Sequence, residues 1–334
     1  MLCPKKNWKN RLQEFFSQKN KEFIQWLNYQ WNIEYQCVRN DIDIQGSPER
    51  TLSRVVVQDK GGNLYLLEEF SKSKFKRRLN VAKAIEFLNK NGLKKALLYQ
   101  KSNSGEFLPF YNDTCFQLSS FLISTEIKRP DYLESSEIGK NFAVFLIQQS
   151  KASINMETKI FFKPFSIKKY IYEIFSTMKI HDLDIYEKYL PFLKFLEKDF
   201  MENHDKLPIS FVHGDLHPLN VIWDQNKIKA VIDWEFAGFK PDLYDAANLV
   251  GCAGIEDPEG LGMPMVMTFI ETIKKQNIIS QKGWSMFPEY VLALRFAWLS
   301  EWLRKKDYEM QELEACFLAI LMDNMDVLRK TWGI

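Results

Sequence analysis

The most informative part of this sequence is Phe211-Val-His-Gly-Asp-Leu-His-Pro-Leu-Asn220, followed by Val231-Ile-Asp-Trp-Glu235. Apolar β-type runs at 209–212 and 228–232 border the first motif and predict two short strands with polar loops beside them. Single residues of these types are usually turn formers or helix caps. Turn chemistry does not explain why Asp215, Asn220 and Asp233 all recur beside the two predicted strands. We therefore expect the three side chains to form one site.

This residue set suits phosphoryl transfer. The reaction needs a carboxylate beside the acceptor hydroxyl and oxygen ligands that hold Mg²⁺ on the donor phosphates. Asp215 would orient the hydroxyl and receive its proton, while Asn220 and Asp233 would bind the metal, which prefers a few hard protein oxygens. Protein kinases share the spacing H-R-D-x-x-x-x-N with a later metal-binding aspartate. In this chain Gly214 replaces the arginine.

The two motifs resemble those of the aminoglycoside phosphotransferase and choline kinase-like superfamily. The chain length and the segment Asp242-Leu-Tyr-Asp-Ala-Ala-Asn-Leu249 agree with that family over roughly residues 40–325. The resemblance implies a two-lobed protein kinase-like fold, with ATP or GTP and Mg²⁺ as cofactors. It also implies these roles: Asp215 as the catalytic base, Asn220 and Asp233 as metal ligands, and His213 and Asp245 as structural supports of the loop.

Hydrophobic periodicity divides the chain into a sheet-rich part and a helical part, an α+β class. We expect an N-terminal helical extension at 1–31, an antiparallel sheet lobe with one main helix at 32–124, and a larger helical lobe at 125–334. The sheet lobe is predicted to hold strands at 33–44, 54–58, 64–70, 96–100, 107–111 and 116–120, and a helix at 74–90. Helices are predicted at 8–31, 135–151, 167–178, 185–200, 243–250, 264–275, 287–305 and 310–330.

Composition excludes several other classes of protein. The 334 residues carry 45 Lys+Arg against 43 Asp+Glu, a net charge of +2, which gives no strong field for steering nucleic acid. The five cysteines form no C-x-x-C pair, which is typical of a reducing compartment. No apolar run approaches the roughly 18–20 residues that span a bilayer, and the lysine-rich N-terminus does not resemble a secretion signal. We expect a cytoplasmic protein without membrane partners, and leave its oligomeric state open.

The nucleotide side departs from the kinase pattern. Glu68 stands on the strand after Gly61-Gly62, where a phosphate-binding lysine is expected. One hypothesis is a reversed pair in which Glu68 bonds a cation of the next helix, Lys76, Arg77 or Lys83, so that another of these or Arg54 faces the phosphates. The alternatives are a register error or a solvated Glu68. The loop 45–51 has a single glycine; Ser47 could donate to phosphate, or the loop could be an ordinary hairpin turn.

The acceptor side is predicted from acidic and aromatic residues of the helical lobe. Trp298, Glu301 and Trp302 share one helix face. Tryptophans and carboxylates can bind an ammonium group, which suits an amino sugar, choline or another aminoalcohol. The competing interpretation is core packing and solvated surface. The remaining acceptor candidates are His217, Glu235, Glu256 and Asp257.

Two other functions compete with that of a small-molecule kinase. His213-Gly-Asp-Leu-His217 could be a His-x-Asp-x-His metal cluster for hydrolysis, although such sites need more ligands than this string offers. His217 could also be a loop residue that bonds the backbone. A nucleotide-binding pseudokinase without transfer activity is the main rival, because of Glu68. The sequence favours a phosphotransferase with a small-molecule hydroxyl acceptor.

Overall fold

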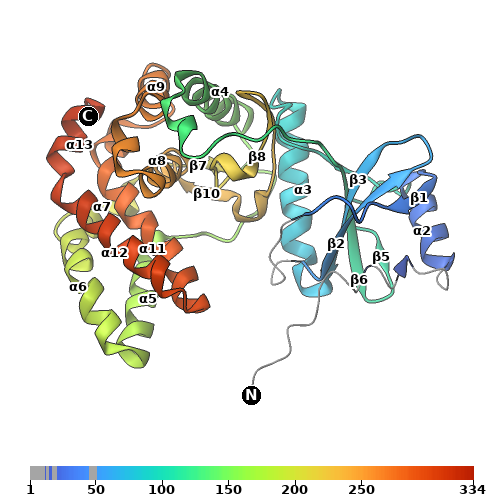
Figure 1. The fold of residues 1–334 in the computed structure, drawn as a ribbon, viewed down its shortest axis with the longest axis horizontal. Coiled ribbons are helices and arrows are strands. Elements are labelled where there is room, and N and C mark those ends of the chain that lie inside the picture. Colours follow the sequence, from blue (N-terminus) through green and yellow to red (C-terminus); the bar gives the residue numbers. More distant parts are fainter. Residues whose placement is uncertain (1–11, 13–14, 17–20, 45–50) are drawn as a thin grey trace. The chain divides into compact units, whose positions relative to one another are not determined.

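The computed structural model describes the chain except residues 1–11, 13–14, 17–20 and 45–50 (Figure 1). The chain forms two compact units. The sheet unit comprises the residues up to Lys90 together with Ala96–Ser124. The helical unit comprises Asn91–Lys95 together with Thr125–Ile334.

The sheet unit is built on one six-stranded sheet in which every pairing is antiparallel. Its strand order is β1-β2-β3-β6-β4, and β5 pairs with β6. The strands are β1 (Tyr35–Val38), β2 (Ser53–Asp59), β3 (Leu64–Ser71), β4 (Tyr99–Gln100), β5 (Phe110–Tyr111) and β6 (Thr114–Ser120). The helices are α2 (Lys21–Trp31) and α3 (Phe75–Lys90).

Both faces of this sheet are covered. Leu67 packs in a buried cluster with Phe23 and Leu27 of α2. Phe70 packs in a second cluster with Ala82 of α3. Because Leu67 and Phe70 are three positions apart on β3, their side chains point to opposite faces. The sheet therefore lies between α2 and α3.

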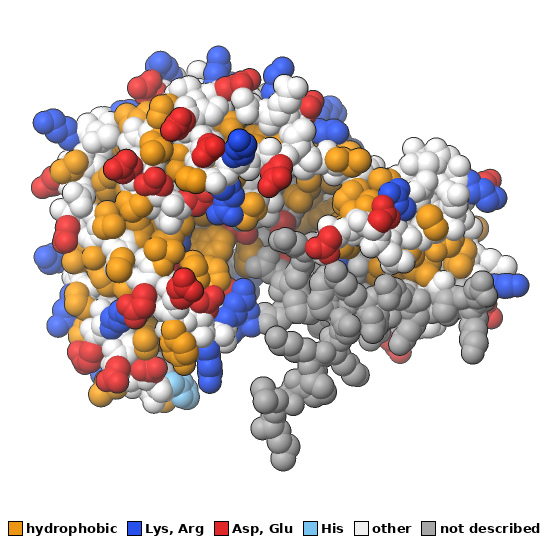
Figure 2. Space-filling model, in the orientation of Figure 1, with side chains coloured by type: hydrophobic (Ala, Val, Ile, Leu, Met, Phe, Trp, Pro, Cys, Tyr) orange, Lys and Arg blue, Asp and Glu red, His pale blue; other side chains and the backbone are white. Residues whose placement is uncertain are grey.

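The helical unit contains most of the helices and two short antiparallel strand pairs. Strand β7 (Ile209–Val212) pairs with β10 (Gly238–Pro241), and β8 (Val221–Asp224) pairs with β9 (Lys227–Val231). On the face seen in Figure 2, acidic and basic side chains are interspersed over this unit, in keeping with the small net charge. Its helices are α4 (Ser136–Ala152), α5 (Ile167–His181), α6 (Leu183–Glu197), α7 (Phe200–Asn203), α8 (Tyr244–Glu256), α9 (Pro264–Lys274), α10 (Gln281–Ser285), α11 (Phe287–Lys305), α12 (Tyr308–Asp323) and α13 (Met325–Trp332).

The local predictions differ from the structure in several elements. The helix predicted at 310–330 is wrong as a single element, because Asn324 leaves the helical conformation and separates α12 from α13. Strand β10 and the short helices α7 and α10 have no counterpart among the predictions. The first part of the helix predicted at 8–31 falls mostly outside the described residues. Among the described residues, no helix has both the length and the apolar character needed to cross a bilayer.

Candidate active site

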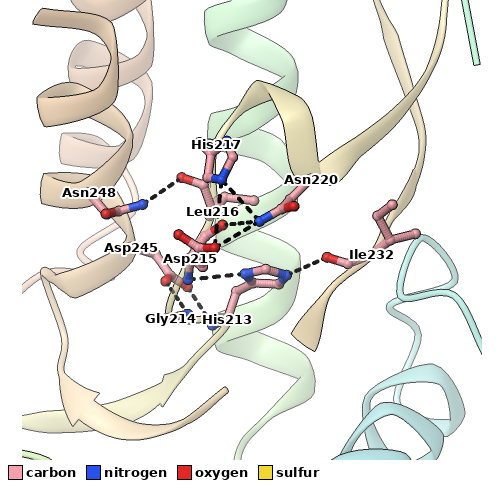
Figure 3. A network of polar contacts seen from close by, with 9 residues as sticks. All are labelled: His213, Gly214, Asp215, Leu216, His217, Asn220, Ile232, Asp245 and Asn248. Atoms are coloured by element: carbon pink, nitrogen blue, oxygen red, sulfur yellow. Dashed lines mark hydrogen bonds and ion pairs between the residues drawn. The ribbon is translucent and has the colours of Figure 1, made fainter. Parts of the chain in front are cut away.

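The predicted catalytic residues lie on two loops that the short strands hold together. The loop 213–220 leaves β7 and enters β8, while Asp233 follows β9 and precedes β10. The β7–β10 pairing, with Val212 opposite Gly238, brings the start of the first loop beside the end of the second. Figure 3 shows the contacts that hold the loops.

Asp215 lies at the centre of the first loop and is partly buried. The side-chain amide nitrogen of Asn220 donates to the main-chain oxygen of Asp215 at 2.8 Å and to the Asp215 carboxylate at 3.1 Å. The Nε2 atom of His217 lies 3.6 Å from the same carboxylate. The loop thus holds the Asp215 carboxylate by contacts to Asn220 and His217 (Figure 3).

His213 is a buried, neutral support of this loop. Its Nε2 lies 2.8 Å from the main-chain oxygen of Ile232, and its Nδ1 accepts from the main-chain N–H of Asp215 at 3.2 Å. Burial lowers the pKa of His213, which favours the neutral ring. Both ring nitrogens are therefore used, which argues against the His-x-Asp-x-His metal cluster. No group of three His, Cys, Asp or Glu side chains among the described residues could hold a metal ion.

Asp245 braces the loop from the first turn of α8. Its carboxylate accepts the main-chain N–H of His213 and of Gly214, each at 2.7 Å, and the side-chain amide of Gln149 at 2.9 Å. Only 2 % of Asp245 is exposed. Such charge-assisted bonds in a buried site are strong. They hold the backbone just before Asp215.

Gly214 is required at its position. Its φ of +84° lies in the left-handed region. A Cβ atom there would also lie 2.3 Å from the main-chain oxygen of Phe236. Because that obstacle is backbone, it cannot rotate away, and any side chain at 214 would displace the loop.

Sequence reasoning missed two residues that hold the loop, Gln149 of α4 and Asn248 of α8. Asn248 donates its amide to the main-chain oxygen of Leu216 at 3.1 Å. The signal for Asn248 was present, since a residue three positions after Asp245 shares its helix face. Gln149 had no comparable signal, because it lies 96 positions from Asp245.

The second loop places oxygen donors suitable for Mg²⁺. The main-chain N–H of Ile232 donates to the main-chain oxygen of Asn220 at 3.0 Å, which brings Asp233 beside Asn220. Asp233 has a left-handed φ of 58°, an uncommon conformation for a residue other than glycine. The Asn220 amide oxygen points away from Asp215 (Figure 3). An amide oxygen and a carboxylate are ligands that Mg²⁺ prefers, so these residues fit the metal.

The predicted acceptor residues divide into two groups. The ring centroid of Trp298 lies 5.9 Å from that of His217 in the first loop. The ring centroid of Trp302, one turn later on α11, lies 6.1 Å from that of Trp298. The Glu301 carboxylate on the same helix pairs with Arg304 at 2.7 Å and Lys305 at 3.0 Å. Glu235 is partly buried in the turn after Asp233.

Glu256 and Asp257 lie outside this group, contrary to our expectation. Glu256 is the last residue of α8, eleven residues after Asp245, so it lies about 16 Å along the helix from the loop brace. It pairs with Arg129 at 2.8 Å. Asp257 accepts the main-chain N–H of Glu259 at 2.9 Å, as a cap of the next turn. Both carboxylates have a structural contact, and their place in an acceptor site stays a prediction.

In the sheet unit, Glu68 lies in a row of polar side chains across three strands. Its Cα partner on β2 is Arg54 and its partner on β6 is Gln117. Residues directly opposite one another point to the same face, so the three share the face that α3 covers. Glu68 is 9 % exposed and Gln117 1 %. The Gln117 side-chain amide has no hydrogen-bond partner among the described residues.

The structure does not bring Lys83 to this row. Lys83 is exposed on the outer side of α3, whereas the buried stripe of the helix includes Arg78. The Arg78 guanidinium lies 4.2 Å from the ring centroid of Phe70, which shares the sheet face of Glu68. Arg78 is therefore a cation of α3 that faces the sheet, and sequence reasoning missed it. Ser47 lies outside the described residues.

Comparisons with known proteins show which proteins this chain is similar to. The model of the phosphotransferase enzyme family (APH) matches residues 50–269, which is more than half of the chain. No curated protein sequence matches the chain.

Solved structures with a similar fold include three small-molecule kinases. The amicoumacin kinase hAmiN, in complex with AMP-PNP, Ca²⁺ and Ami, is 13% identical with a TM-score of 0.65, covering 94% of this chain and 96% of its own. Spectinomycin phosphotransferase APH(9)-Ia, with ADP and spectinomycin, is 13% identical with a TM-score of 0.60, covering 90% and 97%. Choline kinase LicA from Streptococcus pneumoniae is 14% identical with a TM-score of 0.60, covering 92% and 100%. The predicted two-lobed kinase-like fold is confirmed.

Proposed function

Because this chain belongs to the phosphotransferase enzyme family of aminoglycoside phosphotransferases and choline kinase-like proteins, we propose that it transfers the γ-phosphate of ATP or GTP to a hydroxyl group of a small molecule. The observation that carries the proposal is the Asp215 carboxylate, held by Asn220 and His217 on a loop that Asp245 braces. A carboxylate so fixed is suited to accept a proton from a bound hydroxyl.

The chemical step follows from these positions. The acceptor oxygen forms a new bond to the γ-phosphorus while the bond from that phosphorus to the β,γ-bridging oxygen breaks. Asp215 receives the hydroxyl proton, and the nucleoside diphosphate leaves with the bonding electrons. The neutral His213 and the buried Asp245 keep the loop in place during the transfer.

Asn220 and Asp233 are the residues that would hold Mg²⁺. When bound, the metal supplies positive charge to the donor phosphates. The Asn220 amide then serves two groups, since its nitrogen orients Asp215 while its oxygen is turned away from Asp215 (Figure 3). The role of Asn220 thus joins the base to the metal site.

For the acceptor we propose an amino sugar, a choline-like aminoalcohol or a related metabolite. Trp298 supports this choice because its ring lies beside His217, two residues from Asp215. The neighbouring rings already attract protein cations: the Arg295 guanidinium lies 5.8 Å from the Trp298 centroid and the Lys305 ammonium 5.3 Å from that of Trp302. An acceptor with an amino group and a nearby hydroxyl could use the same attraction.

The test is a screen for ADP release with amino sugars, aminoalcohols and their deaminated analogues as acceptors. We expect acceptor-dependent release with an amino-bearing compound. Asp215→Asn should slow it by at least about 100-fold, the usual contribution of a general base. Asp224→Asn, a change at an exposed aspartate of the same unit, is the matched control. If no acceptor stimulates release, or if Asp215→Asn is as fast as the control, the proposal is wrong.

A nucleotide-binding protein without transfer activity is the second candidate, favoured by the buried Glu68 on β3. A carboxylate there repels a triphosphate unless a cation compensates it. A thermal-shift measurement with ATP and Mg²⁺, paired with a slow ATPase assay, separates the candidates. Stabilisation by nucleotide without turnover above that of Asp215→Asn would favour this second function.

A further inference from the structure

Lys240 is a buried lysine at the catalytic loop to which the family motifs give no role. It lies on β10 opposite Ser210 of β7, and only 6 % of it is exposed. Lysines are almost never this buried unless their charge is compensated. The position of this ammonium group therefore calls for an explanation.

The Lys240 ammonium lies against the backbone that carries Asp215. A Cβ atom built on Gly214 would lie 2.6 Å from Nζ of Lys240. Since a Cα–Cβ bond is about 1.5 Å long, Nζ lies within about 4 Å of the Gly214 Cα. Asp215 is the next residue along the chain.

Two aromatic rings hold the ammonium at this point. Nζ lies 4.0 Å from the ring centroid of Tyr244 and 4.9 Å from that of Phe165. Burial, and after it the negative charge of Asp215, raises the pKa of Tyr244. Tyr244 is also the first residue of α8, directly before the loop brace Asp245. Lys240 is thus fixed among the groups that position the base.

We propose that Lys240 is a fixed cation of the transfer centre, which offsets the negative charge that collects there when the phosphoryl group moves to the acceptor oxygen beside Asp215. The inference rests on the proposed function. Asp215, Asp233 and Asp245 bring negative charge to the loops, and the transferred group adds more. A preorganised charge near this point stabilises the transition state more than it stabilises the bound substrates.

The competing role is purely structural, in which Lys240 only fills the space between Phe165 and Tyr244. Lys240→Met keeps the apolar stem and removes the charge, and Lys240→Gln is a second neutral variant in case the first folds poorly. Lys240→Arg restores a cation. Lys227→Met, at an exposed position on β9, is the matched control.

The measurements are kcat, the KM of each substrate, and inhibition by ADP with aluminium fluoride, which mimics the phosphoryl group in transfer. We expect the neutral variants to lose about 100-fold in kcat, as when one preorganised donor is removed, with little change in either KM. They should also lose the preference for ADP with aluminium fluoride over ADP alone. Lys240→Arg should recover part of both.

The outcomes separate this inference from the proposed function. If wild type turns over and a folded neutral variant matches its kcat and its inhibition, Lys240 is structural and the inference fails alone. If wild type shows no acceptor-dependent turnover, the proposed function and the inference fall together. A parallel loss in Lys227→Met would also overturn the assignment, because it would show an effect of general charge.

Discussion

The catalytic loop of the helical unit and the polar row of the sheet unit differ in how they match the kinase pattern. In the loop, Asn220 donates to Asp215 and the Asp245 carboxylate accepts the main-chain N–H of Gly214, and the types and spacing of these residues follow the kinase-like motif. In the row, Glu68 lies on β3, the strand on which that pattern is expected to place a lysine, and the Gln117 amide beside it lacks a partner among the described residues. We infer that the transfer step uses the residue types of the kinase-like motif, whereas the donor nucleotide is bound by residues that differ from that motif.

Among the substitutions that test this comparison, we expect the largest effect on stability and kcat at Asp245. Asp245→Asn leaves one acceptor oxygen for three N–H donors, from His213, Gly214 and Gln149. Each unsatisfied buried group costs about 1–3 kcal/mol, so we expect a loss of about 2–4 kcal/mol in the free energy of unfolding and a large fall in kcat. Chemical denaturation and steady-state kinetics measure the two effects. Asp257→Asn is the control, and equal behaviour of the two variants would show that Asp245 does not brace the loop.

A change at Glu68 sharpens the other half of the comparison. If its carboxylate orients a cation toward the donor phosphates, Glu68→Ala should raise the KM of ATP by about tenfold, the effect of roughly 1.4 kcal/mol, and leave kcat nearly unchanged. Lys83→Ala, on the outer side of α3, should leave the KM unaltered. An unchanged KM in Glu68→Ala would remove Glu68 from the nucleotide site.

A smaller effect is expected at Asn248. Asn248→Ala removes the hydrogen bond to the main-chain oxygen of Leu216, next to Asp215. The loss of one neutral hydrogen bond costs about 1 kcal/mol, and we expect kcat to fall only a few-fold. Denaturant titration with kinetics checks this. If Asn248→Ala lowered the free energy of unfolding and kcat as much as Asp245→Asn, the neutral hydrogen bond of Asn248 would matter as much as the carboxylate contacts of Asp245.

The smallest effect is a decline of stability in mild acid. Burial lowers the pKa of both His213 and His204, so the fold favours the neutral rings. The unfolded chain takes up protons as the pH falls through about 6.5, so stability is complete above that pH and is lost below it. The slope is at most about 1.4 kcal/mol per pH unit for each ring. A Tm series in mild acid should show the decline, and His204→Gln should reduce it; a flat series would contradict the assignment.

Spacing within the motifs allowed the placement of Asp215, Asn220 and Asp233 to be predicted, because they lie in loops beside short strands that the sequence pattern indicates. Long-range contacts such as that of Gln149 with Asp245 leave no local pattern. On α3, hydrophobic periodicity indicates which apolar residues face the sheet, but it does not show that a charged residue, Arg78, is buried among them. The break at Asn324 was missed because neither Gly nor Pro marks it.

The central claim is that Asp215 takes the proton from an acceptor hydroxyl as the γ-phosphate moves to that oxygen. The most direct test is a single-turnover reaction with isotope-labelled γ-phosphate and an acceptor that releases ADP. We predict that label appears on the acceptor hydroxyl in wild type and in Asp224→Asn, and at least about 100-fold more slowly in Asp215→Asn. Label found only as free phosphate, or transferred equally fast by Asp215→Asn, would contradict the claim.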